Sequence, residues 1–275
     1  ACHADNPPLT PPQEVTLHFG HQGVRDFYAY TYGESDDYPE IMSFYTLYWD
    51  LNNTGVINLN HFGSTTTIPN VSWAMGTKNS RNTHGIGGLD VSADLSKTQY
   101  ATAEQAYQDY VALITAFKKA GWQQYFEPFN ARIAKEDNVK LLSHSDRDSN
   151  ELIMSSGFSS DSLTPLTFKE WQYVIAEQET KNYGFELNLT LYLRDINVWI
   201  NISPFDTKPN PIPNQPDLKY YQVRYEFNTA KYNFYKSFID EKNSEQLRQE
   251  YEEWRNWEIE SRQDYETRAK NAGFR

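Results

Sequence analysis

The stretch FELNLTLYLRDINVWINISP, residues 185–204, decides the fold class of this chain. Two runs of aliphatic side chains alternate in it with other, mostly polar residues: Leu187, Leu189, Leu191 and Leu193, then Ile196, Val198, Ile200 and Ile202. Because successive side chains of a strand point to opposite faces of a sheet, each run predicts a strand with one buried face. We therefore expect two adjacent antiparallel strands.

Two amphipathic helices are predicted upstream of these strands. In TAEQAYQDYVALITAFKKAGW, residues 102–122, apolar side chains recur every three or four positions: Ala103, Ala106, Tyr110, Leu113 and Phe117. Thr102 and Gln105 fit a capping box at the start, and Gly121 fits the left-handed position at the end. Residues 167–185, TFKEWQYVIAEQETKNYGF, repeat the arrangement, with Thr167 and Glu170 as caps and the stripe Phe168, Trp171, Val174 and Ile175. The similarity suggests a duplicated αβ element.

The N-terminal part of the chain is predicted to consist mostly of strands. Short aromatic and β-branched runs occupy residues 15–19, 27–32, 43–49, 56–62 and 71–75. Residues 50–55, DLNNTG, have turn chemistry, in which Asn52, Asn53 and Gly55 tolerate positive φ angles. This segment predicts a hairpin or meander. Residues 15–203 are thus expected to form an α+β body, either as one unit or as two halves, 15–100 and 101–203.

The C-terminal part is predicted to be a linker followed by helix. Residues 204–217, PFDTKPNPIPNQPD, contain five prolines and favour a linker. Residues 218–275 are assigned to a C-terminal helical region, with helix from about residue 227 to residue 272. Apolar side chains lie near one side of this helix: Leu247, Tyr251, Trp254 and Ile259. Opposite charges spaced by four predict the ion pairs Arg248 with Glu252, Glu258 with Arg262 and Asp264 with Arg268.

Composition and motifs exclude several classes of function. The formal net charge of -12 argues against nucleic-acid binding, which needs clustered Lys and Arg. The chain has no run of about 18 apolar residues that would span a membrane. It lacks a Gly-x-Ser-x-Gly elbow, a phosphate-binding glycine loop ending in Lys, and a His-Glu-x-x-His sequence. We therefore predict that the protein is not an enzyme, with no catalytic residue and no cofactor.

Histidines and glycines offer three further candidates for a site. His18 and His21 would supply two metal ligands, but the end of a strand places them poorly for one ion. Residues 50–61 begin like a calcium loop, yet His61 stands at the twelfth position, where a bidentate Glu is needed. Residues 79–90, NSRNTHGIGGLD, either bring His84 or Asp90 into a cleft or form a tight loop between strands. The turn and loop interpretations are favoured, and no metal site is predicted.

Residues 1–14 are predicted to be a flexible leader. Residues 3–14, HADNPPLTPPQE, contain four prolines and few apolar side chains, which favours an extended, solvated segment. Such a segment buries too little apolar area to offset the entropy of ordering it. Deletion of residues 3–14 is therefore expected to leave the melting temperature of the body unchanged.

Cys2 is the only cysteine of the chain, so it cannot form an internal disulfide. An Ala followed by Cys and a polar leader resembles the end of a bacterial lipobox after removal of the signal peptide, where the cysteine is acylated. The resemblance implies lipidation of Cys2 and a place in the bacterial cell envelope. His3 stands where an Asp would favour inner-membrane retention, which implies an outer-membrane anchor and a body facing the periplasm. The alternative is an N-terminal extension with an incidental cysteine.

The layout of the whole chain resembles the periplasmic immunity lipoproteins that neutralise type VI secretion effectors. The shared features are the lipobox-like Cys2, the short leader, the α+β body, the acidic charge and the lack of a catalytic motif. The resemblance implies a non-catalytic lipoprotein that binds and neutralises a protein partner, namely a toxic secreted effector.

The residues predicted to contact this partner lie in the C-terminal helix: Tyr251, Trp254, Trp257, Glu253 and Glu258. The three rings are spaced by three residues, so they sweep around the helix and at least one is expected to be exposed. Neighbouring carboxylates would complement a basic partner. The alternative is that all three rings pack the helix onto the body.

Two other functions stay open at this point. An envelope glycan-binding module or glycan-active enzyme would stack Trp and Tyr rings on sugars. Rings gathered in a concave groove would favour that function, whereas a flat or protruding patch would favour a protein partner. A structural lipoprotein of an envelope machine would use the C-terminal helix as its docking face.

Overall fold

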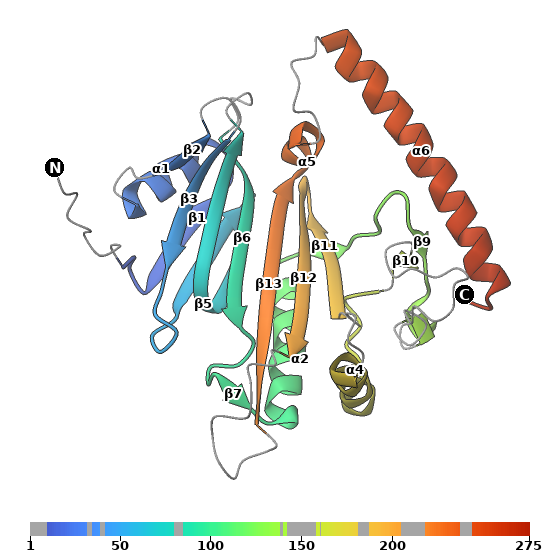
Figure 1. Cartoon of the computed structure of the whole chain (residues 1–275), viewed down its shortest axis with the longest axis horizontal. Coiled ribbons are helices and arrows are strands. Elements are labelled where there is room, and N and C mark those ends of the chain that lie inside the picture. Colours follow the sequence, from blue (N-terminus) through green and yellow to red (C-terminus); the bar gives the residue numbers. More distant parts are fainter. Residues whose placement is uncertain are drawn as a thin grey trace.

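The computed structural model describes residues 10–31, 35–38, 42–79, 85–137, 140–141, 158–159, 161–180, 187–204, 218–236 and 244–275. Its centre is one large, mostly antiparallel sheet of 11 strands, with helices beside it (Figure 1). The main path through the sheet is β1-β4-β5-β6-β13-β12-β11-β8, while β2, β3 and β7 pair off this path. The predicted α+β class is confirmed.

The strands of this sheet are β1 (Glu14–His18), β2 (Asp36–Tyr38), β3 (Met42–Tyr48), β4 (Gly55–His61), β5 (Ser64–Asn79), β6 (Ile86–Asp94), β7 (Tyr100–Ala101), β8 (Gln123–Gln124), β11 (Leu187–Leu193), β12 (Ile196–Pro204) and β13 (Lys219–Thr229). A separate two-stranded sheet consists of β9 (Ala131–Arg132) and β10 (Phe158–Ser159). The helices are α1 (Gly20–Tyr30), α2 (Ala103–Lys119), α4 (Phe168–Thr180), α5 (Ala230–Lys236) and α6 (Ser244–Asn271), with a 3-10 turn at Lys135–Asp137.

The hairpin predicted from residues 185–204 is present. β11 and β12 pair antiparallel from Leu187 with Ile202 to Leu193 with Ile196, joined by Arg194 and Asp195. Seven of the eight alternating aliphatic side chains are buried: Leu187, Leu189, Leu191, Ile196, Val198, Ile200 and Ile202. The period of two therefore identified the face of the sheet that packs against the helices.

Helices α2 and α4 cover this buried face. The Thr102 hydroxyl accepts a hydrogen bond from the Gln105 amide at 3.2 Å, and Gly121 takes a positive φ of 97° at the end of α2. At the start of α4, Thr167 and Glu170 form a reciprocal capping box, with the Thr167 amide donating at 2.9 Å and the Glu170 amide at 3.3 Å. Both predicted helices are confirmed, as are the capping box of α4 and the Thr102 cap of α2. The Gln105 side chain does not complete a box, because it donates to Asp109 Oδ1 at 3.1 Å, and Gly184 lies outside the described residues.

The core between helices and sheet combines aliphatic side chains with a group of contacting aromatic rings. Phe117 of α2 stacks on Tyr225 and Phe227 of β13, and Trp171 of α4 stacks on Tyr110 of α2 with ring centroids 4.8 Å apart. Large, fully buried aromatic side chains contribute much of the apolar area that a domain removes from water. The two helix units differ in their strands, because α2 leads into the two-residue edge strand β8 whereas β11 and β12 form a long hairpin.

β13 corrects the assignment of residues 218–275 to a helical region. This strand lies between β6 and β12 near the middle of the sheet, so it joins the two halves 15–100 and 101–203 into one sheet. Its buried side chains alternate with polar ones: Tyr221, Val223, Tyr225 and Phe227. Helix begins only at Ala230, in α5, and the long helix α6 starts at Ser244. Pro204 ends β12, and the rest of the predicted linker lies outside the described residues.

The run at residues 27–32 is a second correction, because Phe27 to Tyr30 lie in helix α1 rather than in a strand. Phe27 is fully buried, and it packs where β5 has Gly76: a Cβ on Gly76 would lie 2.4 Å from the Phe27 ring. Aromatic residues favour strands only where they pack on a pleated surface. Here the sheet supplies that surface, and helix α1 packs the Phe27 ring onto it at Gly76.

Residues 50–55 form a turn, but not the predicted hairpin. β3 and β4 both pair with β5, over Trp73–Asn79 and Ser64–Val71, so they follow one another along β5. The meander is β4, β5 and β6. None of Asn52, Asn53 and Gly55 adopts the predicted positive φ; Gly55 is required because a Cβ there would lie 2.3 Å from the Trp49 indole.

The predicted leader is attached to the body at its C-terminal end. Pro12 O accepts a hydrogen bond from the indole Nε1 of Trp49 at 3.0 Å, and Gln13 O accepts one from the Val56 amide at 2.8 Å. The side-chain amide of Gln13 also donates to Thr54 O. Residues 12–14 therefore belong to the folded body, contrary to the expected independence of residues 3–14. Residues 1–9, including Cys2, lie outside the described residues.

Two deletions test this boundary. Removing residues 1–9 is expected to leave the melting temperature unchanged, whereas removing residues 1–13 is expected to lower the free energy of unfolding by about 2 kcal/mol. The reason is that the buried indole N–H of Trp49 loses its acceptor, and an unsatisfied buried donor is costly. Thermal and urea denaturation of both truncations measures the difference. An equal loss in both would show that the attachment begins before residue 10.

Candidate functional site

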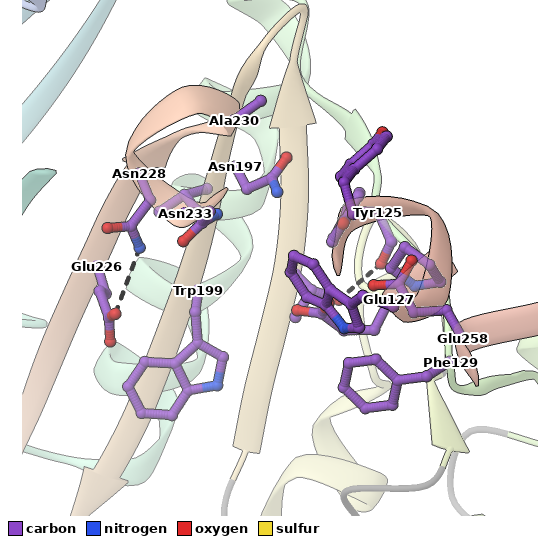
Figure 2. A pocket seen from close by; sticks show the side chains of 15 residues that line it. Tyr125, Glu127, Phe129, Asn197, Trp199, Glu226, Asn228, Ala230, Asn233 and Glu258 are labelled. Atoms are coloured by element: carbon purple, nitrogen blue, oxygen red, sulfur yellow. Dashed lines mark hydrogen bonds between the residues drawn. The ribbon is translucent and has the colours of Figure 1, made fainter. Parts of the chain in front are cut away.

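A cavity of about 580 Å³ lies between α6 and the polar face of the sheet, the face opposite α2 and α4. Its walls come from β11, β12 and β13, from α5, from residues 125–129 after β8, and from α6 (Figure 2). We call it the α6 cavity. Its volume is that of a pocket for a small ligand or a single side chain of a partner.

The lining of the α6 cavity combines aromatic rings with acidic and amide groups. The rings are Tyr125, Phe129, Trp199, Tyr251 and Trp254; the carboxylates are Glu127, Glu226 and Glu258; the amides are Asn197, Asn228 and Asn233. Among the described residues that line it, none is Lys, Arg or His. The side chains that line the cavity therefore carry net negative charge, and the guanidiniums of Arg255 and Arg262 act on Glu258 from outside the lining.

Strand register sets the geometry of the sheet wall. Asn197 of β12 lies opposite Asn228 of β13, and two residues further on Trp199 lies opposite Glu226. Side chains directly opposite one another on an antiparallel pair are close neighbours. Asn228 Nδ2 donates a hydrogen bond to Glu226 Oε1 at 3.3 Å, which orients this carboxylate beside the Trp199 indole (Figure 2).

Arg262 fastens α6 to another wall of the cavity. Its Nε donates to Asn130 O at 3.0 Å, and its Nη2 donates to Phe126 O at 3.2 Å and Glu127 O at 2.7 Å. A planar guanidinium can serve several acceptors at once. This one side chain therefore sets the spacing between α6 and the segment that carries Glu127 and Phe129.

The C-terminal end of α6 is packed and capped. Its buried cluster comprises Ala131, Ile133, Leu141, Ala269 and Phe274. The Arg275 amide donates to Asp137 Oδ2 at 2.6 Å, and this hydrogen bond holds the pKa of the Asp137 carboxyl below its ordinary value. The helix is thus fixed by its C-terminal half, and its N-terminal half stands away from the strands, over the cavity (Figure 1).

Burial affects two ionisable groups of the cavity. It raises the pKa of the Glu258 carboxyl above its ordinary value, while the guanidiniums of Arg255 and Arg262 act in the opposite direction. Burial also raises the pKa of the Tyr125 phenol, and the charges of Glu127 and Glu258 add to this rise. Both shifts have the sign expected where water is excluded and negative charge is concentrated.

No relative was found among known proteins. The comparisons found no match to the chain among family models, curated proteins or solved structures. The site is therefore interpreted from its own geometry.

The structure divides the five residues predicted to bind a partner. Tyr251, Trp254 and Glu258 line the α6 cavity, while Trp257 and Glu253 are not among its lining residues. Trp257 is 52 % exposed and Tyr251 is 42 % exposed, which confirms that at least one ring is exposed. The alternative that all three rings pack the helix onto the body stays open, because a half-exposed ring can also make such a contact: the Trp257 ring lies 5.7 Å from the ring of Phe129.

Two of the three ion pairs expected along α6 are present. Arg248 pairs with Glu252 at 2.9 Å, and Arg268 pairs with Asp264 at 2.8 Å. Arg262 does not pair with Glu258, because its guanidinium donates to the backbone carbonyls named above. Sequence spacing identifies partners within one helix, and it does not reveal acceptors on a distant segment.

Sequence reasoning missed the sheet side of the cavity. Trp199 carried a usable signal, since a large ring in the polar phase of an alternating strand must lie on the face opposite the core. Glu226 carried a similar signal within β13, which was not identified as a strand. Tyr125, Glu127 and Phe129 lie in irregular structure, and no local pattern indicates them.

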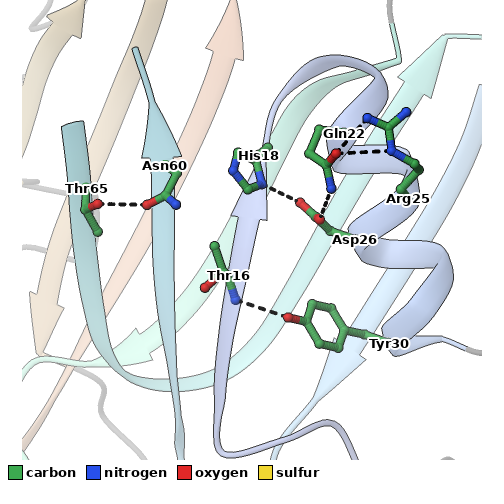
Figure 3. Close-up of polar contacts among 8 residues, drawn as sticks. All are labelled: Thr16, His18, Gln22, Arg25, Asp26, Tyr30, Asn60 and Thr65. Carbon is green, nitrogen blue, oxygen red and sulfur yellow. Dashed lines mark hydrogen bonds and ion pairs between the residues drawn. The ribbon is translucent and has the colours of Figure 1, made fainter. Parts of the chain in front are cut away.

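The histidine and glycine candidates have structural partners. His18 Nδ1 lies 2.8 Å from Asp26 Oδ2 of helix α1 (Figure 3). The sequence predicted the end of a strand at His18, and it did not predict the helix that supplies this partner. The described residues contain no group of three or more His, Cys, Asp or Glu side chains arranged for a metal ion. Of the remaining candidates, Asp90 lies in β6 and His84 lies outside the described residues.

A second cavity, of about 250 Å³, lies beside His61 and the glycines of residues 85–87. His61 Nε2 lies 3.1 Å from Asp195 Oδ1, and burial lowers the pKa of His61 while the contact with Asp195 opposes this change. A Cβ on Gly85 would lie 2.3 Å from the Gly20 carbonyl. This glycine is therefore explained by backbone packing. Of the predicted loop at residues 79–90, residues 80–84 lie outside the described residues and residues 86–90 belong to β6.

Proposed function

We propose that this protein binds a basic protein partner through α6. The observation that carries the proposal is Trp257, which is 52 % exposed on a helix held by its C-terminal half. Glu253 and Glu260 are also exposed and lie four residues before and three residues after it, on the same side of the helix. We call Glu253, Trp257 and Glu260 the outer α6 surface.

The chemistry of the outer α6 surface fits a partner that carries Lys or Arg. An accessible Trp supplies much contact area, and Trp is enriched among the residues that dominate binding energy. Surrounding carboxylates speed the encounter with a positively charged surface and disfavour acidic partners. Neither the exposed ring nor the carboxylates require a reaction centre. In this proposal the protein therefore acts by binding and not as an enzyme.

More specifically, we propose that the partner is a toxic secreted effector and that this protein is a periplasmic immunity lipoprotein that neutralises it. The resemblance of the chain's layout to such lipoproteins supports this form. No helix in the described part of the chain is long and apolar enough to cross a membrane. Membrane attachment, in this proposal, comes from acylation of Cys2.

Acyl labelling tests the attachment. In the native host, the product of the full precursor is expected to incorporate a labelled fatty acid and to fractionate with the outer membrane. The Cys2→Ser variant is expected to be unlabelled and to be released from the membrane fraction. The reason is that the lipobox resemblance implies acylation of the Cys2 thiol, and the chain has no other cysteine. Equal labelling of both forms would contradict the lipoprotein part of the proposal.

Replacement of Trp257 by Ala tests the partner. Capture of a partner from envelope extract, identified by mass spectrometry, is expected to weaken about thirtyfold, the equivalent of about 2 kcal/mol for a dominant interface residue. Folding should be nearly unaffected, because the ring is half exposed. Tyr28→Ala, at an exposed position on α1, is the matched control and should leave capture unchanged.

Two results would contradict the proposal. One is that Trp257→Ala captures the same partner with unchanged affinity. The other is that the captured protein presents an acidic surface, because the carboxylates of the outer α6 surface would then repel it.

Glycan binding is the second candidate, and one specific observation favours it. The rings of the α6 cavity are gathered in a concave space, which is the arrangement associated above with sugar stacking. Sugar hydroxyls can also donate hydrogen bonds to the carboxylates that line the same cavity.

A further inference from the structure

Two tryptophan side chains of the α6 cavity have no stacking partner. Trp199 comes from β12 and Trp254 from α6, so they belong to two different walls of the cavity, and both are half-buried. Within the described part of the chain, neither indole interacts with another ring or a cationic group, and neither indole N–H donates a hydrogen bond. The other three rings of the cavity each have such a neighbour: Tyr125 has Tyr192, Phe129 has Trp257, and Tyr251 has Arg255.

The two unstacked indoles favour a ligand that presents flat apolar faces. A half-buried ring face gains free energy when apolar C–H groups replace the water beside it. In a pyranose of the glucose configuration the hydroxyl groups are equatorial, so C–H groups occupy both faces of the ring and the hydroxyls surround its rim. We propose that the α6 cavity binds a neutral, β-linked saccharide of glucose configuration, with one pyranose ring between Trp199 and Trp254.

The groups beside Trp199 suit the hydroxyls of such a ring. Glu226 lies directly opposite Trp199, and the pair of Asn197 and Asn228 lies two residues further along the same strands (Figure 2). Neighbouring strands are about 4.8 Å apart, so these side chains are close to the edge of the indole. Amide groups both donate and accept, and a carboxylate has several acceptor positions. Glu226 can therefore accept from a hydroxyl in addition to the hydrogen bond that it receives from Asn228.

The composition of the lining favours a neutral saccharide over an acidic one. The described lining residues include three carboxylates and no Lys, Arg or His, so a sugar acid or a phosphorylated sugar would meet no basic side chain in the cavity. A nucleoside would also stack on an indole, but its base carries fewer donors for the acceptors of the lining than a saccharide carries hydroxyls. The volume of about 580 Å³ is typical of pockets for small ligands.

This inference rests on glycan binding, the second candidate function, and not on the protein partner. The outer α6 surface consists of Glu253, Trp257 and Glu260, and none of these residues is among those that line the cavity. A saccharide in the cavity therefore leaves the outer α6 surface free for a protein.

Calorimetric titration of the purified chain, with saturation-transfer NMR of the ligand, tests the ligand class. The probes are cellobiose and N,N′-diacetylchitobiose, and the comparison ligands are sorbitol, the hyaluronan disaccharide and adenosine. Sorbitol supplies hydroxyls without ring faces, and the hyaluronan disaccharide carries a carboxylate. At least one neutral disaccharide is expected to bind about tenfold or more tightly than all three comparison ligands, with saturation reaching its ring C–H protons. An equal or tighter affinity for a comparison ligand, or no binding of either disaccharide, would overturn the proposal.

Alanine substitution of the two indoles tests the site within the cavity. Trp199→Ala and Trp254→Ala are each expected to weaken the disaccharide by about tenfold or more. Trp73→Ala is the matched control, because Trp73 is a half-buried tryptophan of β5 in the same sheet and is not among the described lining residues. It should change the affinity less than about twofold. A loss in only one of the two cavity variants, or an equal loss in Trp73→Ala, would overturn the placement between the two indoles.

Glu226→Gln gives a second measurement that does not depend on removing a large ring. The substitution keeps the shape of the side chain and an acceptor for Asn228, so the fold should be retained, as the melting temperature checks. The loss of a charged acceptor is expected to weaken the disaccharide by about threefold or more. Unchanged affinity would contradict the position of the hydroxyls beside Glu226.

Failure of this inference and failure of the partner proposal are distinguishable. The titrations use the purified chain without a partner, whereas capture by Trp257→Ala tests the outer α6 surface alone. Absence of saccharide binding would remove the second candidate function and leave the capture result unaffected. Unchanged capture by Trp257→Ala would contradict the partner proposal whatever the titrations give.

Discussion

Replacing Phe227 by Ala is expected to lower the free energy of unfolding by about 4 kcal/mol, the largest effect of a single substitution expected here. Phe227 is fully buried in β13, between β6 and β12. Its ring centroid lies 5.7 Å from that of Trp122 and 6.4 Å from that of Phe117. Removal of the ring therefore loses apolar burial and leaves a cavity where the two halves of the sheet meet.

Urea denaturation measures this loss. Tyr48→Ala is the matched control, because Tyr48 is an aromatic residue of strand β3 that is 56 % exposed, and its removal should cost less than about 1 kcal/mol. A loss for Phe227→Ala no larger than that of Tyr48→Ala would contradict the central position of β13 in the sheet.

Replacing Arg262 by Lys or Ala is expected to lower stability by about 2 to 3 kcal/mol and to loosen the N-terminal half of α6. The guanidinium donates to three backbone carbonyls, at Phe126, Glu127 and Asn130. Hydrogen bonds from a charged donor contribute more than neutral ones, and their loss leaves half-buried carbonyls without this donor. Lys cannot reproduce the fork, so both substitutions should behave alike.

Hydrogen–deuterium exchange along α6 measures the consequence. Exchange in residues 244–262 should become faster, because Arg262 joins α6 to the segment that carries Glu127 and Phe129. Arg248→Ala is the matched control: Arg248 forms exposed pairs with Glu245 and Glu252 on the same helix, and such pairs contribute about 0.5 kcal/mol. Equal effects of the two Ala substitutions would show that Arg262 acts only as a surface charge.

The elements that the sequence predicted correctly are those defined by neighbouring residues. The β11–β12 hairpin follows from alternation on both sides of Arg194 and Asp195, and α4 begins where Thr167 and Glu170 bond to one another. Each of these signals is complete within about twenty residues. The exposure of at least one of the three rings Tyr251, Trp254 and Trp257 also followed from helical spacing alone.

The elements that were mispredicted depend on distant partners. Phe27 lies in a helix because β5 has a glycine at position 76 that receives its ring. β3 and β4 do not form a hairpin because β5 is long enough to pair with both. Pro12 and Gln13 belong to the body because Trp49 and Val56 supply donors 37 and 43 positions further along the chain. Local composition contains none of this information.

The sequence by itself determined the α+β class, the positions of α2 and α4, and the hairpin at residues 187–204, because hydrophobic period and end caps are properties of consecutive residues. Only the tertiary structure decided that β13 joins the two halves of the sheet, and that Glu127, Trp199, Glu226 and Trp254 share one cavity. These residues lie on separate elements, and their meeting depends on strand register and on the contacts of Arg262. Such contacts form only when segments far apart in the chain are brought together, so a pattern of neighbours cannot specify them.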